Sequence, residues 1–270
     1  MAEIISVIMN KGGVGKTTLA TNLSGALDIK KNAKILIVDT DGQGNAAITF
    51  RFDPSKFENT IYDVLMGNEH IENVIVNINE NIDLVPANED MNFFEYDILS
   101  RINNFSNHSQ AFHLLKEALK PVQDKYDYII IDSPPSMGLV TKNVLVAADS
   151  VLLPFIPEVY NVKGLIRIVS AINEVKETEN KGLEILGVIG MMIDIRTNLH
   201  ALFIENANVF CDTAGIPMFR TFIPRSIVFA NANALDKLPA VYRDRKNKAT
   251  KAYFELMEEI LNGKKIKERV

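Results

Sequence analysis

The sequence predicts an α/β fold in which a doubly wound, mostly parallel sheet is flanked by helices. Short runs rich in β-branched residues alternate with longer amphipathic stretches, the pattern of repeated βαβ units. The apolar runs are nearly continuous, as expected of strands that are covered on both faces. A glycine-rich loop also stands between the first strand and the first helix, where open α/β sheets bind ligands.

The expected elements follow from these patterns in chain order. We expect strands at residues 3–9, 34–41, 81–87, 126–135, 150–155 and 184–194. We expect helices at residues 16–29, 110–119, 139–147, 162–176, 199–212 and 246–261. The polar segment RINNFSNHSQ, residues 101–110, reads as a loop between helices. With no internal repeat and no low-complexity linker, residues 1–270 are predicted to form a single domain.

Composition narrows the class of protein. In 270 residues, 47% are hydrophobic and 23% charged, which is typical of a globular chain. Cys211 is the only cysteine, which excludes an intramolecular disulfide and a metal site built from several thiolates of one chain. The first apolar run is too short for a signal sequence, and no apolar stretch is long enough to span a bilayer. We therefore expect a cytoplasmic protein with no stable membrane insertion.

The net charge of −5 gives no general attraction for nucleic acid or anionic lipid, so any such binding needs a local basic patch. Two late segments are candidates: RDRKNKATK at residues 243–251 and the terminal KKIKERV. A solvated helix face is the alternative for both.

The segment KGGVGKTT, residues 11–18, is a deviant phosphate-binding loop of the P-loop NTPase type, because Asn10 stands where the ordinary motif has glycine. Its glycines allow backbone N–H groups to turn toward a phosphate, and the following helix adds its positive end. Lys16 is expected to contact the β- and γ-phosphates of ATP, and the Thr17 hydroxyl to ligate Mg²⁺. The predicted nucleotide-binding residues of the loop are Lys11, Gly12, Gly13, Val14, Gly15, Lys16, Thr17 and Thr18.

Lys11 precedes the tight turn, so its side chain should lie on the outer side of the loop and away from the phosphates of its own subunit. We expect two subunits to face each other across two nucleotides, each giving Lys11 to the other's phosphates in a catalytic role. A homodimer that forms on ATP binding follows. The alternative is an exposed, solvated lysine.

Three aspartates complete the expected site. Asp39 and Asp41 end the second predicted strand in IVDTDGQGN, and Asp132 ends the strand of YIIIDSPPS. We assign Asp41 to orienting the attacking water, since a carboxylate of ordinary pKa is a weak base. Asp39 and Asp132 are predicted Mg²⁺ ligands together with Thr17. For Asp39 and Asp41, capping the following turn is the alternative role.

These segments, with DIRTNL and FIPRSI further on, resemble the ParA/Soj-type partition ATPases of the MinD/ParA superfamily over most of the chain. One departure is Gly42, where that family usually has proline after the second aspartate. Another is NANALDKLPA, residues 231–240, which differs from the usual stretch after the arginine of FIPRSI.

The resemblance implies an ATP-bound sandwich dimer that binds non-specific double-stranded DNA, associates with the nucleoid, and hydrolyses ATP when a ParB-like centromere-binding protein stimulates it. Arg196 falls where the family has a DNA-binding arginine, and Arg225 is a possible second contact. The segment with Pro224 and Arg225 also lies where the family holds adenine. The further expected DNA contacts are Lys246, Lys248 and Lys251. For Arg196 the alternative is a surface ion pair with Asp194.

Other classes share the deviant loop. Iron–sulfur carriers of this kind need at least two cysteines per subunit, and capsular tyrosine kinases need a tyrosine-rich tail, so the sequence excludes both. A MinD-like membrane-associated positioning ATPase is the main alternative, although the helical pattern of Tyr253, Leu256, Met257, Ile260 and Leu261 reads as a helix packed on the core. A nucleotide switch that scaffolds a partner complex without carrying DNA also stays open.

Overall fold

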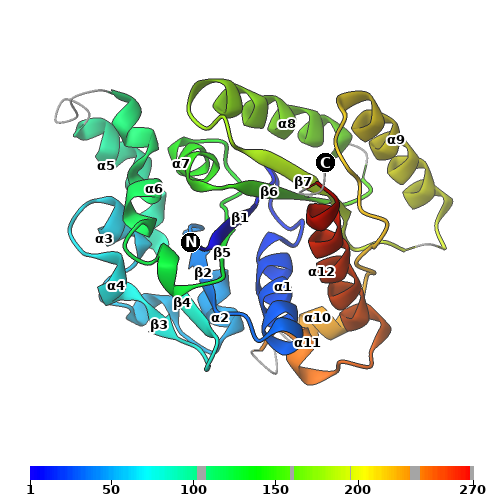
Figure 1. Ribbon diagram of the computed structural model, residues 1–270, viewed down its shortest axis with the longest axis horizontal. Coiled ribbons are helices and arrows are strands. Elements are labelled where there is room, and N and C mark those ends of the chain that lie inside the picture. The colour runs from blue at the N-terminus through cyan, green and yellow to red at the C-terminus, as the bar shows by residue number, and fades with distance from the viewer. Residues whose placement is uncertain (102–107, 159–160, 195, 232–237, 268–270) are drawn as a thin grey trace.

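One seven-stranded sheet organises the chain in the computed structural model, which describes residues 1–101, 108–158, 161–194, 196–231 and 238–267 (Figure 1). The strand order is β3-β4-β2-β5-β1-β6-β7. All neighbouring strands pair in parallel except β3 and β4, which are antiparallel. The strands are β1 (Glu3–Val7), β2 (Ile35–Asp39), β3 (Val76–Asn77), β4 (Ile82–Val85), β5 (Tyr128–Asp132), β6 (Ser150–Phe155) and β7 (Glu184–Gly190).

The two faces of the sheet are covered by separate layers of helices (Figure 1). Contacts between α1 (Lys16–Lys31), α11 (Ala240–Arg243) and α12 (Lys248–Lys267) make up one layer. The other layer joins α5 (Phe94–Ser100), α6 (Leu114–Leu119), α7 (Leu139–Ala147) and α8 (Asn161–Thr178), and α9 (Asn198–Ala214) packs on α8. The remaining short helices are α2 (Asn45–Thr49), α3 (Ile61–Leu65), α4 (Ile71–Val74) and α10 (Ile227–Asn231).

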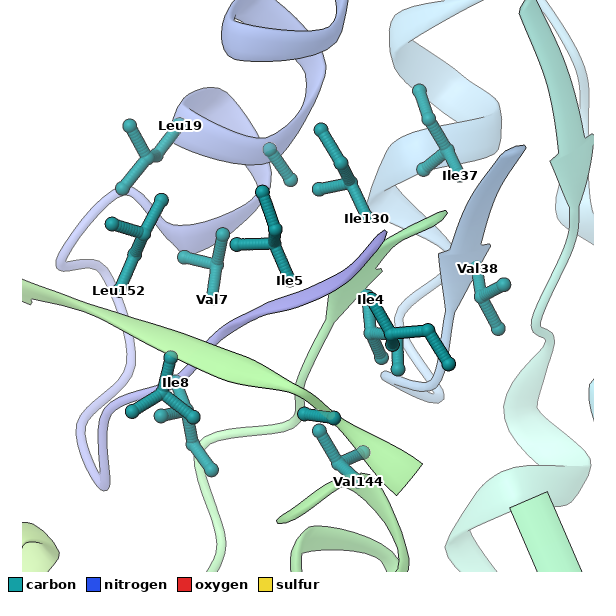
Figure 2. Close-up of a cluster of buried hydrophobic side chains, with 14 of the residues drawn as sticks. Ile4, Ile5, Val7, Ile8, Leu19, Ile37, Val38, Ile130, Val144 and Leu152 are labelled. Atoms are coloured by element: carbon teal, nitrogen blue, oxygen red, sulfur yellow. The ribbon is translucent and has the colours of Figure 1, made fainter. Parts of the chain in front are cut away.

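The core lies on both sides of β1. Because successive strand residues point to opposite faces, Ile5 and Val7 project toward Leu19 of α1, whereas Ile4 projects toward the side of α7 (Figure 2). These four side chains are at most 3% exposed. Burial on both faces explains why the strands read as continuous apolar runs rather than as alternating ones.

The predicted architecture is confirmed, and the elements differ from the expected ones mainly at their ends. Helix α7 has the expected bounds of 139–147, and β6 has those of 150–155. The helix expected at 110–119 begins only at Leu114, after a 3-10 turn at His108–Phe112. Antiparallel β3 was not predicted, because two residues carry no periodicity. Most of the loop expected at 101–110 lies outside the described residues.

Among the helices that the structure describes, none combines the length and the apolar character needed to cross a membrane.

Removing side-chain volume from the central strand should destabilise the fold strongly. Ile130 of β5 is fully buried (Figure 2), so Ile130→Ala should lower the free energy of unfolding by about 2–5 kcal/mol. Ile166→Ala is the matched control, because Ile166 on α8 is 46% exposed and its loss should change stability by less than about 0.5 kcal/mol. Urea unfolding followed by circular dichroism measures both, and equal losses would contradict this account of the core.

Candidate nucleotide site and basic cavity

The order of the parallel strands brings the predicted site residues to one edge of the sheet. β1 lies between β5 and β6, and β5 lies between β2 and β1. Val7 pairs in register with Asp132, and Asp132 pairs with Asp39 on the other side. The loop that follows β1 therefore stands directly above the aspartates that end the two neighbouring strands.

The glycine-rich loop has the conformation that its sequence predicts. Gly13 and Gly15 have φ of 73° and 87°, values that residues with a β-carbon rarely adopt. A β-carbon at Gly15 would also lie 3.0 Å from Cε of Met191. Helix α1 begins at the next residue, so its first backbone N–H groups face the space that the loop encloses.

Lys16 is buried, and its Nζ donates a hydrogen bond to the backbone carbonyl of Lys11 at 3.1 Å. Burial lowers the pKa of Lys16, while the charges of Asp132 and Asp41 act in the opposite direction. The lysine thus bridges the two ends of the loop and faces carboxylates across it.

Asp132 is fully buried and accepts a hydrogen bond from the Thr17 hydroxyl at 2.5 Å. Its other carboxylate oxygen, Oδ1, has no hydrogen-bond partner. Burial raises the pKa of Asp132 to about 7, although the bond from Thr17 and the charge of Lys16 lower it. A buried oxygen without a hydrogen-bond donor destabilises the fold unless a cation or a water molecule binds to it. A hydroxyl and a carboxylate next to a phosphate loop are a donor set that fits Mg²⁺.

Asp39 is also fully buried, but both of its carboxylate oxygens are used within the chain. They accept the backbone N–H groups of Asp41 at 3.0 Å and of Ala46 at 3.1 Å. Burial raises the pKa of Asp39 well above its ordinary value, and the neighbouring Asp132 adds to the effect. Asp39 thus holds the loop that carries Asp41, as in the capping alternative, and it is not among the residues that line the cavity described next.

A cavity of about 430 Å³ opens between the glycine-rich loop and the loop after β2. Asp41 lines it together with Lys16 and Thr17, as the sequence predicts. One Asp41 oxygen accepts the backbone N–H of Gln43 at 3.1 Å, and the side chain is half-buried. The other lining residues are Gly12, Gly13, Gly15, Thr18, Gln43, Asn45, Ile48, Thr49, Pro135 and Met192.

Lys11 is not among the residues that line this cavity. Its Nζ forms an ion pair with Glu158 at 2.6 Å, and its side chain is 42% exposed. The lysine is therefore accessible, but it is held within its own chain in this structure.

A second cavity, of about 600 Å³, brings together four of the five predicted DNA-contacting residues from three parts of the chain. Its basic side chains outnumber its acidic ones by five to two. Arg196 forms a two-pronged ion pair with Asp194, with N···O distances of 2.9 and 2.8 Å, and this pair holds the pKa of Asp194 below its ordinary value. The lining residues are Ile193, Asp194, Arg196, Arg220, Thr221, Phe222, Pro224, Arg225, Lys248, Lys251, Ala252 and Glu255.

The predicted adenine segment lies in this second cavity. Pro224 and Arg225 line it, and neither lines the cavity at the glycine-rich loop. Lys246 is exposed and lines neither of the two.

Several residues that line the two cavities were not predicted, among them Arg220 and Met192. Arg220 precedes Arg225 by five residues and could have been found as a second basic residue of that segment. Met192 has a left-handed backbone conformation, with φ of 54°, and nothing in the sequence predicts this conformation for a methionine.

The parallel sheet, the glycine-rich loop and the buried Thr17–Asp132 pair define a P-loop ATPase. A family model described as AAA domain matches residues 2–185. The chain belongs to the ParA/Soj family of partition ATPases, within the MinD/ParA superfamily, which confirms the resemblance of its motifs.

The relatives support this assignment over the full length of the chain. The chain is 34% identical over 261 residues to the sporulation initiation inhibitor protein Soj of Bacillus subtilis, and the alignment covers 96% of this chain and 98% of Soj. It is 33% identical over 262 residues to the chromosome partitioning protein ParA of Myxococcus xanthus, covering 97% and 88% of the two chains.

The chain is also similar to a solved structure that contains a bound nucleotide analog. Cobyrinic acid a,c-diamide synthase from Mycobacterium smegmatis, with a bound ATP analog and magnesium, superimposes with a TM-score of 0.83 at 29% identity. The match covers 97% of this chain and 94% of that one.

The raised pKa of Asp132 predicts a pH-dependent effect on stability. Folding raises this pKa from 3.8 to about 7, so the folded state binds more protons between these values and stability falls as the pH rises through them. Asp132→Asn does not titrate. The free energy of unfolding of the variant minus that of the wild type should therefore increase by about 1–4 kcal/mol from pH 4 to pH 8, measured on nucleotide-free protein. Urea unfolding over this range tests it, and a difference that does not change with pH would contradict the assignment.

Proposed function

We propose that this protein is an ATP-dependent DNA partition ATPase whose ATP-bound dimer binds non-specific DNA and hydrolyses ATP when a ParB-like partner stimulates it. The observation that carries the proposal is the convergence of Lys16, Thr17 and Asp132 at the carboxyl edge of a parallel sheet. Membership in the ParA/Soj family supports the same function.

The chain's own groups are suited to bind the phosphates of ATP. The N–H groups of the loop and of the first turn of α1 donate to phosphate oxygens, and Lys16 exchanges its bond to the Lys11 carbonyl for the β- and γ-phosphates. Thr17 and Asp132 would hold Mg²⁺, which supplies charge neutralisation at the transferred phosphoryl group.

Asp41 is the group proposed to orient the attacking water. It lines the cavity, and one of its oxygens accepts the backbone N–H of Gln43. The two bonds that Asp39 accepts hold this segment in place, so Asp39 acts on catalysis by positioning the loop rather than as a Mg²⁺ ligand.

Lys11 is proposed to reach the nucleotide of the second subunit. Its ion pair with Glu158 is exposed, and exposed pairs contribute about 0–1 kcal/mol, so a triphosphate on a facing subunit can replace it. Dimerisation then depends on ATP, because the lysine gains a stronger partner only when nucleotide is present.

The second cavity is the proposed DNA surface. Its excess of basic side chains attracts phosphates without reading base sequence. Met192 lines the nucleotide cavity and the next residue, Ile193, lines the basic one. Ile193 also exchanges backbone hydrogen bonds with Ile223 and Arg225, so a shift of this segment on ATP binding would move the basic residues.

The packing of α12 favours partition over a MinD-like membrane function. Tyr253, Leu256, Met257 and Ile260 are at most 5% exposed, so these apolar residues contact the core and are not available to lipid.

Loss of Lys11 should separate nucleotide binding from dimerisation. Lys11→Ala should bind ATP as a monomer with at most about a few-fold change in affinity, but should show no ATP-dependent dimer by light scattering. Lys120→Ala is the matched control, because it removes another exposed lysine paired with a glutamate, Glu117, on α6. A Lys11→Ala variant that dimerises normally with ATP would refute the trans-acting role.

Charge reversal in the basic cavity should affect DNA binding alone. Arg196→Glu should weaken binding of random-sequence duplex DNA by about tenfold or more and reduce its salt dependence, while ATP-dependent dimerisation persists. Lys176→Glu, an exposed reversal on α8, should leave both properties unchanged. Co-sedimentation with DNA and, separately, with anionic liposomes tests this. Retention on liposomes but not on DNA would favour the membrane function instead.

A further inference from the structure

Helix α5 presents an exposed apolar face that the nucleotide and DNA sites do not use. Phe93, which caps the start of the helix, and Tyr96 and Leu99 within it are 60%, 75% and 56% exposed. They stand three residues apart, and residues at this spacing are neighbours on a helix surface. The opposite face of the helix is anchored, because Phe94 and Ile98 are buried in the core. Among the described residues, this is one of the few places where aromatic and aliphatic side chains gather in the open.

The charge around this face is mainly negative, with Arg101 at the end of α5 as a basic neighbour. Residues 89–100, EDMNFFEYDILS, contain four acidic residues and no basic one. Asp97 accepts a hydrogen bond from the Tyr62 hydroxyl and Asp90 accepts one from the Asn88 side chain, while Glu89 and Glu95 are exposed. Like charges repel anionic lipid, nucleic acid and a second copy of the same face. The complementary partner is therefore a protein segment with apolar side chains flanked by basic ones.

The same segment touches both loops that carry the site's aspartates. Asn92 packs on Gly42, next to Asp41, so closely that a β-carbon at Gly42 would lie 2.8 Å from the Asn92 Oδ1. Glu95 accepts the backbone N–H of Leu139 at 3.4 Å, and a β-carbon at Gly138 would lie 2.3 Å from Oε2 of Glu95. Gly138 ends the loop that follows Asp132, and Leu139 is the first residue of α7. A ligand on α5 could thus displace both loops.

We propose that the exposed face of α5, formed by Phe93, Tyr96 and Leu99, is a docking surface for a basic, amphipathic segment of a partner protein. Asn92 and Glu95 convey its binding to the loops of Asp41 and Asp132. This inference rests on the proposed function, since it assigns a surface to the partner that stimulates hydrolysis. In Figure 1, α5 and α9 lie at opposite ends of the molecule, so a partner bound at α5 would not cover the surface of α9.

The binding test uses a labelled synthetic peptide of about 18 residues, five helical turns, with leucines on one face and lysine and arginine on its flanks. Fluorescence anisotropy should show binding to the wild-type protein. The variant with Phe93→Ser, Tyr96→Ser and Leu99→Ser should bind about tenfold or more weakly, because the anchoring side chains are gone. A peptide with glutamate at every basic position should not bind.

The matched control carries Leu199→Ser, Leu202→Ser and Val209→Ser, three exposed apolar residues of α9, and should bind like the wild type. Tyr96→Ser alone is the milder variant, with an expected loss of about threefold. Circular dichroism melting checks that each variant is folded. No binding to the wild type, equal binding by the α5 triple variant, or equal loss in the α9 variant would overturn the docking surface.

The coupling test measures ATP turnover with and without the basic peptide. The peptide should change turnover of the wild type, whereas Glu95→Gln should bind the peptide but respond about threefold less or not at all. A response of Glu95→Gln equal to the wild type would refute the coupling. Peptide binding in a protein without any ATP turnover would instead count against the proposed function, which keeps the two failures distinct.

Discussion

The arrangement of the site depends on one topological constraint, the position of β1 between β5 and β6 in a parallel sheet. Parallel strands end at the same edge, so the loop after β1 meets Asp132 at the end of β5 and Asp39 at the end of β2. The strand order of the sheet alone is therefore enough to bring these residues together.

Burial of charge is the second feature that shapes this edge. Asp39 and Asp132 are fully buried next to each other, and a buried carboxylate is costly unless hydrogen bonds or cations compensate it. Asp39 obtains two backbone donors, whereas Asp132 has Thr17 on one oxygen and nothing on the other. This difference supports the proposal that Asp39 holds the loop while Asp132 is the carboxylate that binds Mg²⁺. The edge of the sheet is thus arranged for a charged ligand.

Local sequence signals predicted the parts of the structure that depend on local rules. The strands, the glycine-rich loop and the edge position of Asp132 follow from apolar runs, φ preferences and motif spacing. The contacts of Lys11 with Glu158 and of Asn92 with Gly42 join residues that are far apart in the chain, so they cannot be predicted from the periodicity of the sequence. Short helices such as α3 and α4 escaped prediction, because four or five residues hardly complete one turn. Pro224 and Arg225 were expected beside the nucleotide, and Arg225 also as a DNA contact; the folded chain shows that both line the basic cavity.

We propose above all that the Lys11 side chain breaks its ion pair with Glu158 and contacts the triphosphate bound to a second subunit. A crystal structure with Mg²⁺ and a non-hydrolysable ATP analogue tests it most directly. The account predicts a two-fold dimer in which Lys11 Nζ lies about 3 Å from a phosphate oxygen of the facing subunit's nucleotide, with its bond to Glu158 broken. A nucleotide-bound structure in which Lys11 stays on Glu158 and points away from any second subunit would contradict it.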